Sequence, residues 1–211
     1  MSNWRLDWPT SGGSRIASGR LKTAPGDFIV DELLELPESG PAVDGDVIAG
    51  SGEHLCLKLE KVGDNTEYVA RELARIAGCR HFDVGFCGLK DRHAVTRQWF
   101  SLYRPGNEDQ DTALIREIGL RWPVLAVSRQ ARKLRRGEHR GNGFTITLRA
   151  VSGEHQVIDR ALERLGDIGA PNYFGPQRFG NDGANLDRAV HLDPATQNRR
   201  GRSGGKGRGG K

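Results

Sequence analysis

The segment GLKDRHAVTRQ, residues 88–98, follows one short apolar run and leads into another, so it predicts a loop that connects two strands. It carries one acid, Asp91, close in sequence to the cations Lys90, Arg92 and Arg97. Positive charge favours the ionised carboxylate, whereas a place beside an apolar strand removes part of its water. A carboxylate that is ionised but poorly hydrated is a better nucleophile or base than one in water, so Asp91 is a candidate catalytic residue.

The loop around Asp91 also fits an ordinary surface turn. Structural ion pairs perturb carboxylates in the same way as catalytic sites do, and the spacing of these residues does not separate the two interpretations. Motifs elsewhere in the chain are therefore needed to distinguish a catalytic Asp91 from a structural one.

Six segments around this loop have the alternating or continuous apolar pattern of strands. They are Phe28 to Leu36, Leu55 to Leu59, Val84 to Phe86, Gln98 to Tyr103, Val124 to Val127, and the alternating residues Phe144, Ile146 and Leu148.

Two further segments have the spacing of helices. Asn65 or Thr66 can cap the first, which ends at Gly78. The second ends at Gly166. The apolar faces consist of Val69, Leu73, Ile76 and Ala77 in the first, and of Val157, Ile158, Ala161, Leu162 and Leu165 in the second. Because strands outnumber helices and run in pairs, we predict an α+β fold with a mainly antiparallel sheet.

The composition predicts a soluble globular protein. The 211 residues are 36% hydrophobic and 28% charged, and no apolar run has the length of a membrane span or the form of a secretory signal. The three cysteines, Cys56, Cys79 and Cys87, are too few for a disulfide scaffold. This cysteine usage predicts a reducing, cytoplasmic location.

Positive charge is concentrated in two places. The segment 197–211 holds six of the 32 basic residues, no acid and no apolar side chain, so we expect it to be disordered. The second concentration has a single acid, Glu138, and consists of Arg129, Arg132, Lys133, Arg135, Arg136 and Arg140. It could neutralise several phosphates of a nucleic acid, or it could be a solvated charged loop.

Four possible metal ligands, Cys79, His81, Cys87 and His93, lie within fifteen residues of one another. Their spacing does not match the Cys-x2-4-Cys or His-x3-5-His pairs of structural zinc sites, and each would come from a different kind of element. We therefore expect buried thiols and loop imidazoles here and no metal.

Three residues could contact a nucleobase. The amide of Asn142 can read a base edge, and Phe144 can either stack on a base or pack in the core. The alternation of Phe144 with Ile146 and Leu148 favours the core. Phe28 leaves the same two alternatives open.

Four blocks of the chain fall in a recognisable order between about Leu21 and Leu186. They are Leu21-Lys22 with Asp27-Phe28-Ile29-Val30, then GLKDRHAVTRQ, then RKLRRG with GNGFT, and then PNYFGPQRFG. Together they resemble the TruD-type tRNA pseudouridine synthases in both order and interval. One block alone would be weak, but four in register make a chance match improbable.

The resemblance implies an enzyme that isomerises uridine to pseudouridine at position thirteen of tRNA, with no metal or other cofactor. It implies that Asp91 is the catalytic aspartate, as nucleophile at C1′ or as a base that assists glycal formation. Four residues of the blocks are predicted to bind the substrate, namely Lys22, Phe28, Asn142 and Phe144. The residues predicted to contact the RNA backbone are Arg132, Lys133, Arg135 and Arg136. The expected partner is tRNA, and neither a protein partner nor a membrane is predicted.

The resemblance also implies the domain plan. The family's catalytic domain is interrupted by an inserted domain and then resumes. We expect residues 1–170 to form the first part of that catalytic domain, 171–196 to begin the insertion, and 197–211 to be the tail. The returning segment is missing here, so we expect a truncated chain of doubtful activity. The alternative is a non-catalytic RNA-binding module that uses the basic cluster and the tail.

Overall fold

The computed structural model describes residues 4, 13–38, 40, 47–171 and 173–192. The chain divides into two compact units. The central unit comprises residues 19–152, and the terminal unit comprises the described residues up to Ser18 and from Gly153 onward. Each unit is considered by itself. The predicted tail 197–211 lies outside the described residues, and the predicted domain boundary at residue 170 stays a prediction.

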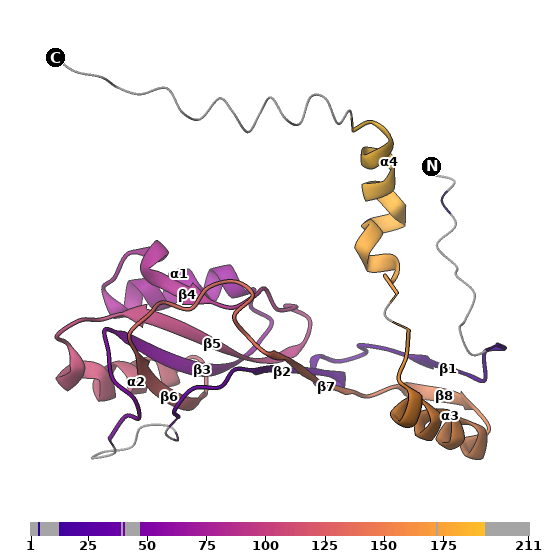
Figure 1. The fold of residues 1–211 in the computed structure, drawn as a ribbon, viewed down its shortest axis with the longest axis horizontal. Coiled ribbons are helices and arrows are strands. Elements are labelled where there is room, and N and C mark those ends of the chain that lie inside the picture. Colours follow the sequence, from indigo (N-terminus) through magenta and orange to yellow (C-terminus); the bar gives the residue numbers. More distant parts are fainter. Residues whose placement is uncertain (1–3, 5–12, 39, 41–46, 172, 193–211) are drawn as a thin grey trace. The chain divides into compact units, whose positions relative to one another are not determined.

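The central unit is built on a six-stranded sheet in the order β6-β3-β5-β2-β7, with β4 paired to β5 (Figure 1). Its elements are β2 (Phe28–Leu33), β3 (His54–Val62), α1 (Thr66–Ala77), β4 (Val84–Phe86), β5 (Val95–Tyr103), α2 (Asp111–Gly119), β6 (Val124–Gln130) and β7 (Gly141–Ile146). The pair β2–β5 is parallel and the other pairs of this sheet are antiparallel. The predicted α+β class with a mainly antiparallel sheet is confirmed.

One face of the sheet packs against the helices. Leu55, Leu57 and Leu59 of β3 are fully buried in a cluster with apolar side chains of α1 and α2. Residues paired across neighbouring strands share a face. Phe100 of β5, opposite Leu57, therefore also belongs to this helix-bearing face.

The first predicted helix is confirmed as α1. Asn65 is its N-cap, because its side chain accepts a hydrogen bond from the Tyr68 amide at 2.7 Å. Gly78 ends the helix with a φ of 66°, a left-handed conformation that glycine adopts without steric cost. Of its predicted apolar stripe, Val69 and Leu73 are fully buried, and Ile76 and Ala77 are half-buried against the same core cluster.

Helix α2 was not predicted. It has only nine residues, and its three buried apolar side chains, Leu114, Ile115 and Ile118, cover barely one helical repeat. A pattern this short is not separable from a loop or a strand. The two strands of a separate sheet, β1 (Ala17–Arg20) and β8 (Arg149–Gly153), were also missed, since β1 carries no apolar alternation.

The terminal unit contains α3 (His155–Ile168), which was predicted, and α4 (Ala184–Val190). None of the residues of α3 is fully buried, and Val157, Ile158 and Ala161 of its apolar stripe are half-buried. Short 3-10 helices complete the structure as η1 (Pro25–Asp27), η2 (His81–Asp83), η3 (Glu108–Gln110), η4 (Pro176–Phe179) and η5 (Asn181–Gly183). No described helix is long and apolar enough to cross a membrane.

Candidate active site

Asp91 lies in the loop between β4 and β5, as predicted, with its side chain 29% exposed. Its Oδ2 accepts a hydrogen bond from Lys22 Nζ at 2.6 Å, and its Oδ1 accepts one from the His93 amide at 2.9 Å. The hydrogen bond from Lys22, followed by that from His93, lowers the pKa of Asp91 below its usual value. The carboxylate is therefore ionised at neutral pH and partly shielded from water.

The cation beside Asp91 is not one that the loop itself supplies. Lys90 Nζ lies 2.5 Å from Glu32 Oε2, and Arg97 Nε lies 2.9 Å from Glu60 Oε2. The sequence-based interpretation of Lys90 and Arg97 as the charges acting on Asp91 is therefore wrong, and Arg92 is likewise not among the groups that lower its pKa. Lys22, 69 residues away, takes that role because the strand order brings the segment before β2 alongside the loop before β5.

Lys22 joins Asp91 to an aromatic pair. Its ammonium lies 4.1 Å from the centroid of the Phe28 ring, a cation–π distance. Its backbone has a φ of 56°, a left-handed conformation that is uncommon for a residue other than glycine. Backbone strain of this kind clusters at functional sites.

Phe144 extends the aromatic surface. Its ring centroid lies 5.9 Å from that of Phe28, with the two planes tilted by 39°. Its side chain is 58% exposed, so the predicted place of Phe144 in the core is wrong. Phe144 is paired with Val30 across β2 and β7, and Val30 is in turn paired with Thr96 of β5, so Phe144 lies on the helix-bearing face of the sheet.

Asn142 lies on the same face as Phe144, two residues earlier on β7 and opposite Glu32 of β2. Its Oδ1 is buried and has no hydrogen-bond partner among the described residues. A buried acceptor without a donor costs free energy, so this amide is an unsatisfied polar group within the region of Asp91. The structure thus gathers Lys22, Phe28, Asp91, Asn142 and Phe144 in one region of the central unit.

Four basic residues predicted to contact an RNA backbone, Arg132, Lys133, Arg135 and Arg136, lie in the loop between β6 and β7. This loop touches the segment before Asp91, because the Gly137 amide donates to the Cys87 carbonyl at 2.8 Å. Arg132 and Arg135 are exposed, and the described structure shows no ion pair of either side chain. Arg136 forms an exposed ion pair with Glu67, and Lys133 donates to the carbonyl of Phe82.

Arg129, the first residue of the predicted basic cluster, is not part of this surface. It is only 6% exposed, and its guanidinium binds Asp111 and Glu108. Arg129 is therefore a structural residue of the core. Arg140, at the other end of the cluster, is exposed and pairs with Glu35.

Metal binding finds no support in the described part of the chain, where no three His, Cys, Asp or Glu side chains are grouped to hold an ion. Of the four residues considered from the sequence, Cys87 is buried, and burial raises the pKa of its thiol to about 12. A thiol with that pKa is neutral at physiological pH.

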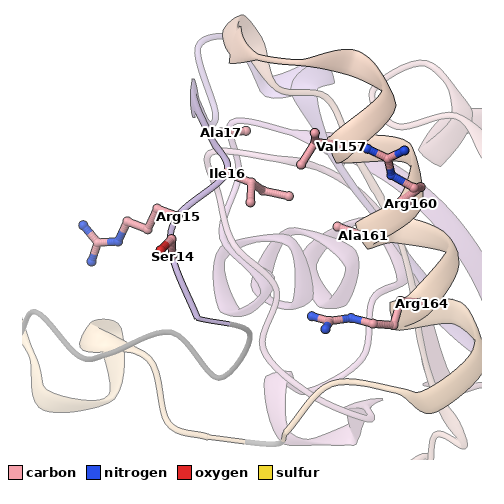
Figure 2. Close-up of a pocket in the computed structure, with 8 residues that line it drawn as sticks. All are labelled: Ser14, Arg15, Ile16, Ala17, Val157, Arg160, Ala161 and Arg164. Carbon is pink, nitrogen blue, oxygen red and sulfur yellow. The ribbon is translucent and has the colours of Figure 1, made fainter.

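A pocket of about 530 Å³ lies within the terminal unit and is shown in Figure 2. Val157, Arg160, Ala161 and Arg164 of α3 line one side of it, and residues 14–17 line the other. None of the predicted site residues borders this pocket. The candidate active site therefore lies in the central unit and not in this pocket.

Known proteins resemble this chain over most of its length. The family model described as tRNA pseudouridine synthase D (TruD) matches residues 12–187. The chain is 64% identical over 206 residues to tRNA pseudouridine synthase D of Marinobacter nauticus, covering 96% of this chain and 59% of that protein. It is 44% identical over 190 residues to a protein of the same name from Pseudomonas putida, covering 90% of this chain and 51% of that protein.

A solved structure is also similar. It is described as the putative tRNA pseudouridine synthase D (TruD) from Methanosarcina mazei, and it superposes with a TM-score of 0.60 at 28% identity. The match covers 77% of this chain and 35% of that one. The chain spans 59% of the length of the Marinobacter nauticus protein and 51% of the length of the Pseudomonas putida protein.

Proposed function

From the premise that the chain belongs to the tRNA pseudouridine synthase D family, we propose that it isomerises uridine to pseudouridine at position thirteen of tRNA, with Asp91 as the catalytic carboxylate. The observation that carries the proposal is the ion pair of Asp91 with Lys22 beside the aromatic pair Phe28–Phe144. An ionised carboxylate next to a surface on which a base can stack is what this chemistry requires.

The reaction breaks the N1–C1′ bond of uridine, turns the uracil and rejoins it to C1′ through C5. The proton on C5 is lost and N1 gains one, so the product is an isomer and no redox step occurs. Asp91 can attack C1′, and it is then displaced when C5 of the uracil bonds to C1′. Alternatively, it can remove the C2′ proton to give a glycal and return that proton later. Both routes need the ionised carboxylate.

The surrounding side chains suit the remaining tasks. The target uridine must leave its stack, and Phe28 and Phe144 offer replacement stacking. If the Asn142 side chain turns toward the bound base, its unpartnered Oδ1 can accept the N3–H of uracil. The Lys22 ammonium would lie close to the negative charge that the uracil gains as its bond to C1′ breaks.

The test is to incubate the protein with a tRNA that carries uridine at position thirteen and to map pseudouridine by primer extension after carbodiimide treatment. The same tRNA with cytidine at that position is the matched substrate control. The longer relative that is 64% identical is the positive control for the assay. Product at position thirteen supports the proposal. Tight tRNA binding without product, while the relative is active, would favour the RNA-binding module instead.

The Lys22→Met substitution is expected to raise the pKa of Asp91. The Lys22 hydrogen bond is the main cause of the lowered value, and a methionine of similar length cannot donate it. The pKa can be followed by NMR titration of the carboxyl carbon of Asp91. The matched control is Lys58→Met, which removes the ion pair with Asp31. The acid limb of the activity profile should shift to higher pH in Lys22→Met alone, and an unchanged Asp91 pKa would contradict the assignment of this contact.

Replacing both Arg132 and Arg135 with alanine is expected to weaken tRNA binding and its dependence on salt. Each phosphate contact adds about 0.7 to 0.9 to the slope of log K against log salt, so the slope should fall by about 1.5 for the pair. Fluorescence anisotropy at salt concentrations from about 0.05 to 0.3 M measures this slope. Arg116→Ala on α2 is the control for loss of charge elsewhere. An unchanged slope in the double variant would show that this loop does not contact the backbone.

A further inference from the structure

The loop segment that precedes Asp91 rests on four polar side chains that are almost completely buried. Glu32 and Gln98 are 0% exposed, Thr66 is 1% exposed, and the side chain of Lys90 is 5% exposed. None of the four bonds to the Asp91 carboxylate, whose hydrogen bonds come from Lys22 and His93. Direct bonding to Asp91 therefore does not account for their burial beside the loop.

Glu32 fills a gap in the sheet. Along one edge of β5, residues 95–97 pair with β2 and residues 100–102 pair with β4, so Gln98 and Trp99 face neither strand. The Trp99 amide donates instead to Glu32 Oε1 at 3.1 Å. The other oxygen, Oε2, accepts from Lys90 Nζ at 2.5 Å. Both carboxylate oxygens are used, and Lys90 is tied to the point where the edge of β5 passes from one partner strand to the other.

A second connection runs through Thr66 and Gln98. The Lys90 amide donates to Thr66 Oγ1 at 3.0 Å, and this hydroxyl donates to Gln98 Oε1 at 3.0 Å. The amide group of Gln98 then donates to the Gly88 carbonyl at 2.5 Å. The main chain is thus bound at Gly88 and again at Lys90, immediately before Asp91.

A buried ion pair is weak evidence for stability, because well-packed apolar residues in its place are often neutral or stabilising. A fully satisfied polar network instead fixes one geometry. We propose that Glu32, Lys90, Thr66 and Gln98 are positioning residues, which hold the loop where the Asp91 carboxylate meets Lys22. The importance of this position for catalysis rests on the proposed function.

The test of the ion pair is a double-mutant cycle with Glu32→Gln, Lys90→Met and the two combined. Each single substitution leaves a buried charge without its partner, so Tm should fall, whereas the double variant has no unpaired charge and Tm should recover. If the pair only stabilised the fold, the double variant would have the wild-type kcat and the wild-type pKa of Asp91. As a positioning pair, its loss should leave the pKa of Asp91 raised and kcat lowered by about 10- to 100-fold with KM for tRNA unchanged.

Thr66→Val and Thr66→Ser test the second connection without touching a charge. Valine lacks the hydroxyl that joins Lys90 to Gln98, and serine keeps it, while the helix cap at Asn65 is intact in both. Thr66→Val should raise the pKa of Asp91 and lower kcat, and Thr66→Ser should restore both. Asp111→Asn, at a buried carboxylate bound by two arginines, is the control and should lower Tm with the pKa of Asp91 unchanged.

The Asp91 titration separates the two hypotheses, since it needs no tRNA. A raised pKa in the double variant and in Thr66→Val, from a wild-type protein that makes no pseudouridine, would support the positioning role and contradict the proposed function. A wild-type pKa and wild-type kcat in both variants would overturn the positioning role and leave the proposed function intact.

Discussion

Replacing Asp91 with asparagine is expected to lower the rate of pseudouridine formation by at least about 100-fold, the lower end of the contribution of a positioned general base. Asparagine has nearly the shape of aspartate, and its carbonyl oxygen can still accept a hydrogen bond from Lys22 or the His93 amide. It is neither a nucleophile towards C1′ nor a base for the C2′ proton. The loss should therefore appear in kcat, with tRNA affinity retained.

The measurement is tritium release from tRNA labelled at C5 of uridine, together with anisotropy for binding. Asp83→Asn is the matched control, because Asp83 belongs to the segment before β4 and is paired with Arg80 instead of Lys22. Wild-type turnover in Asp91→Asn would refute the catalytic assignment. Equal binding with no product from either protein would instead favour the RNA-binding module.

The Asp111→Ala substitution is expected to cost about 3 to 5 kcal/mol of unfolding free energy, the range found when one partner of a buried ion pair is removed. Asp111 is 1% exposed, with Oδ1 bound by Arg104 Nε at 3.0 Å and Oδ2 by Arg129 Nε at 2.8 Å. Alanine would leave both guanidinium groups buried without this counter-charge. Hydrogen bonds from Arg129 and Arg104 to nearby carbonyl groups would compensate only in part.

Urea denaturation followed by tryptophan fluorescence measures this loss, since Trp99 and Trp122 are buried in the central unit. The control is Asp109→Ala, an exposed acid two residues earlier, which should change stability by no more than about 0.5 kcal/mol. A loss below about 1 kcal/mol in Asp111→Ala would show that the two arginines are adequately solvated without it.

The elements that the sequence predicted well are those whose signals are local. Helix α1 has a capping asparagine, a four-residue apolar stripe and a terminal glycine, all within fourteen residues. Strand β3 has an alternation of leucines in sequence that predicted it correctly, although Cys56 on the other face is buried as well. The short α2 has too few apolar positions to give a comparable local signal, and the strands β1 and β8 pair with each other from positions far apart in the chain.

The sequence by itself determined the α+β class, the loop that carries Asp91 and the family, because periodicity, turn residues and ordered motifs are all read along one dimension. Only the tertiary structure decided that Lys22 is the cation on Asp91, that Lys90 belongs to Glu32, and that Arg129 is buried. These contacts depend on which strands lie side by side and in what register. Neighbours in sequence, such as Lys90 and Asp91, can point to different partners once the strand order is set.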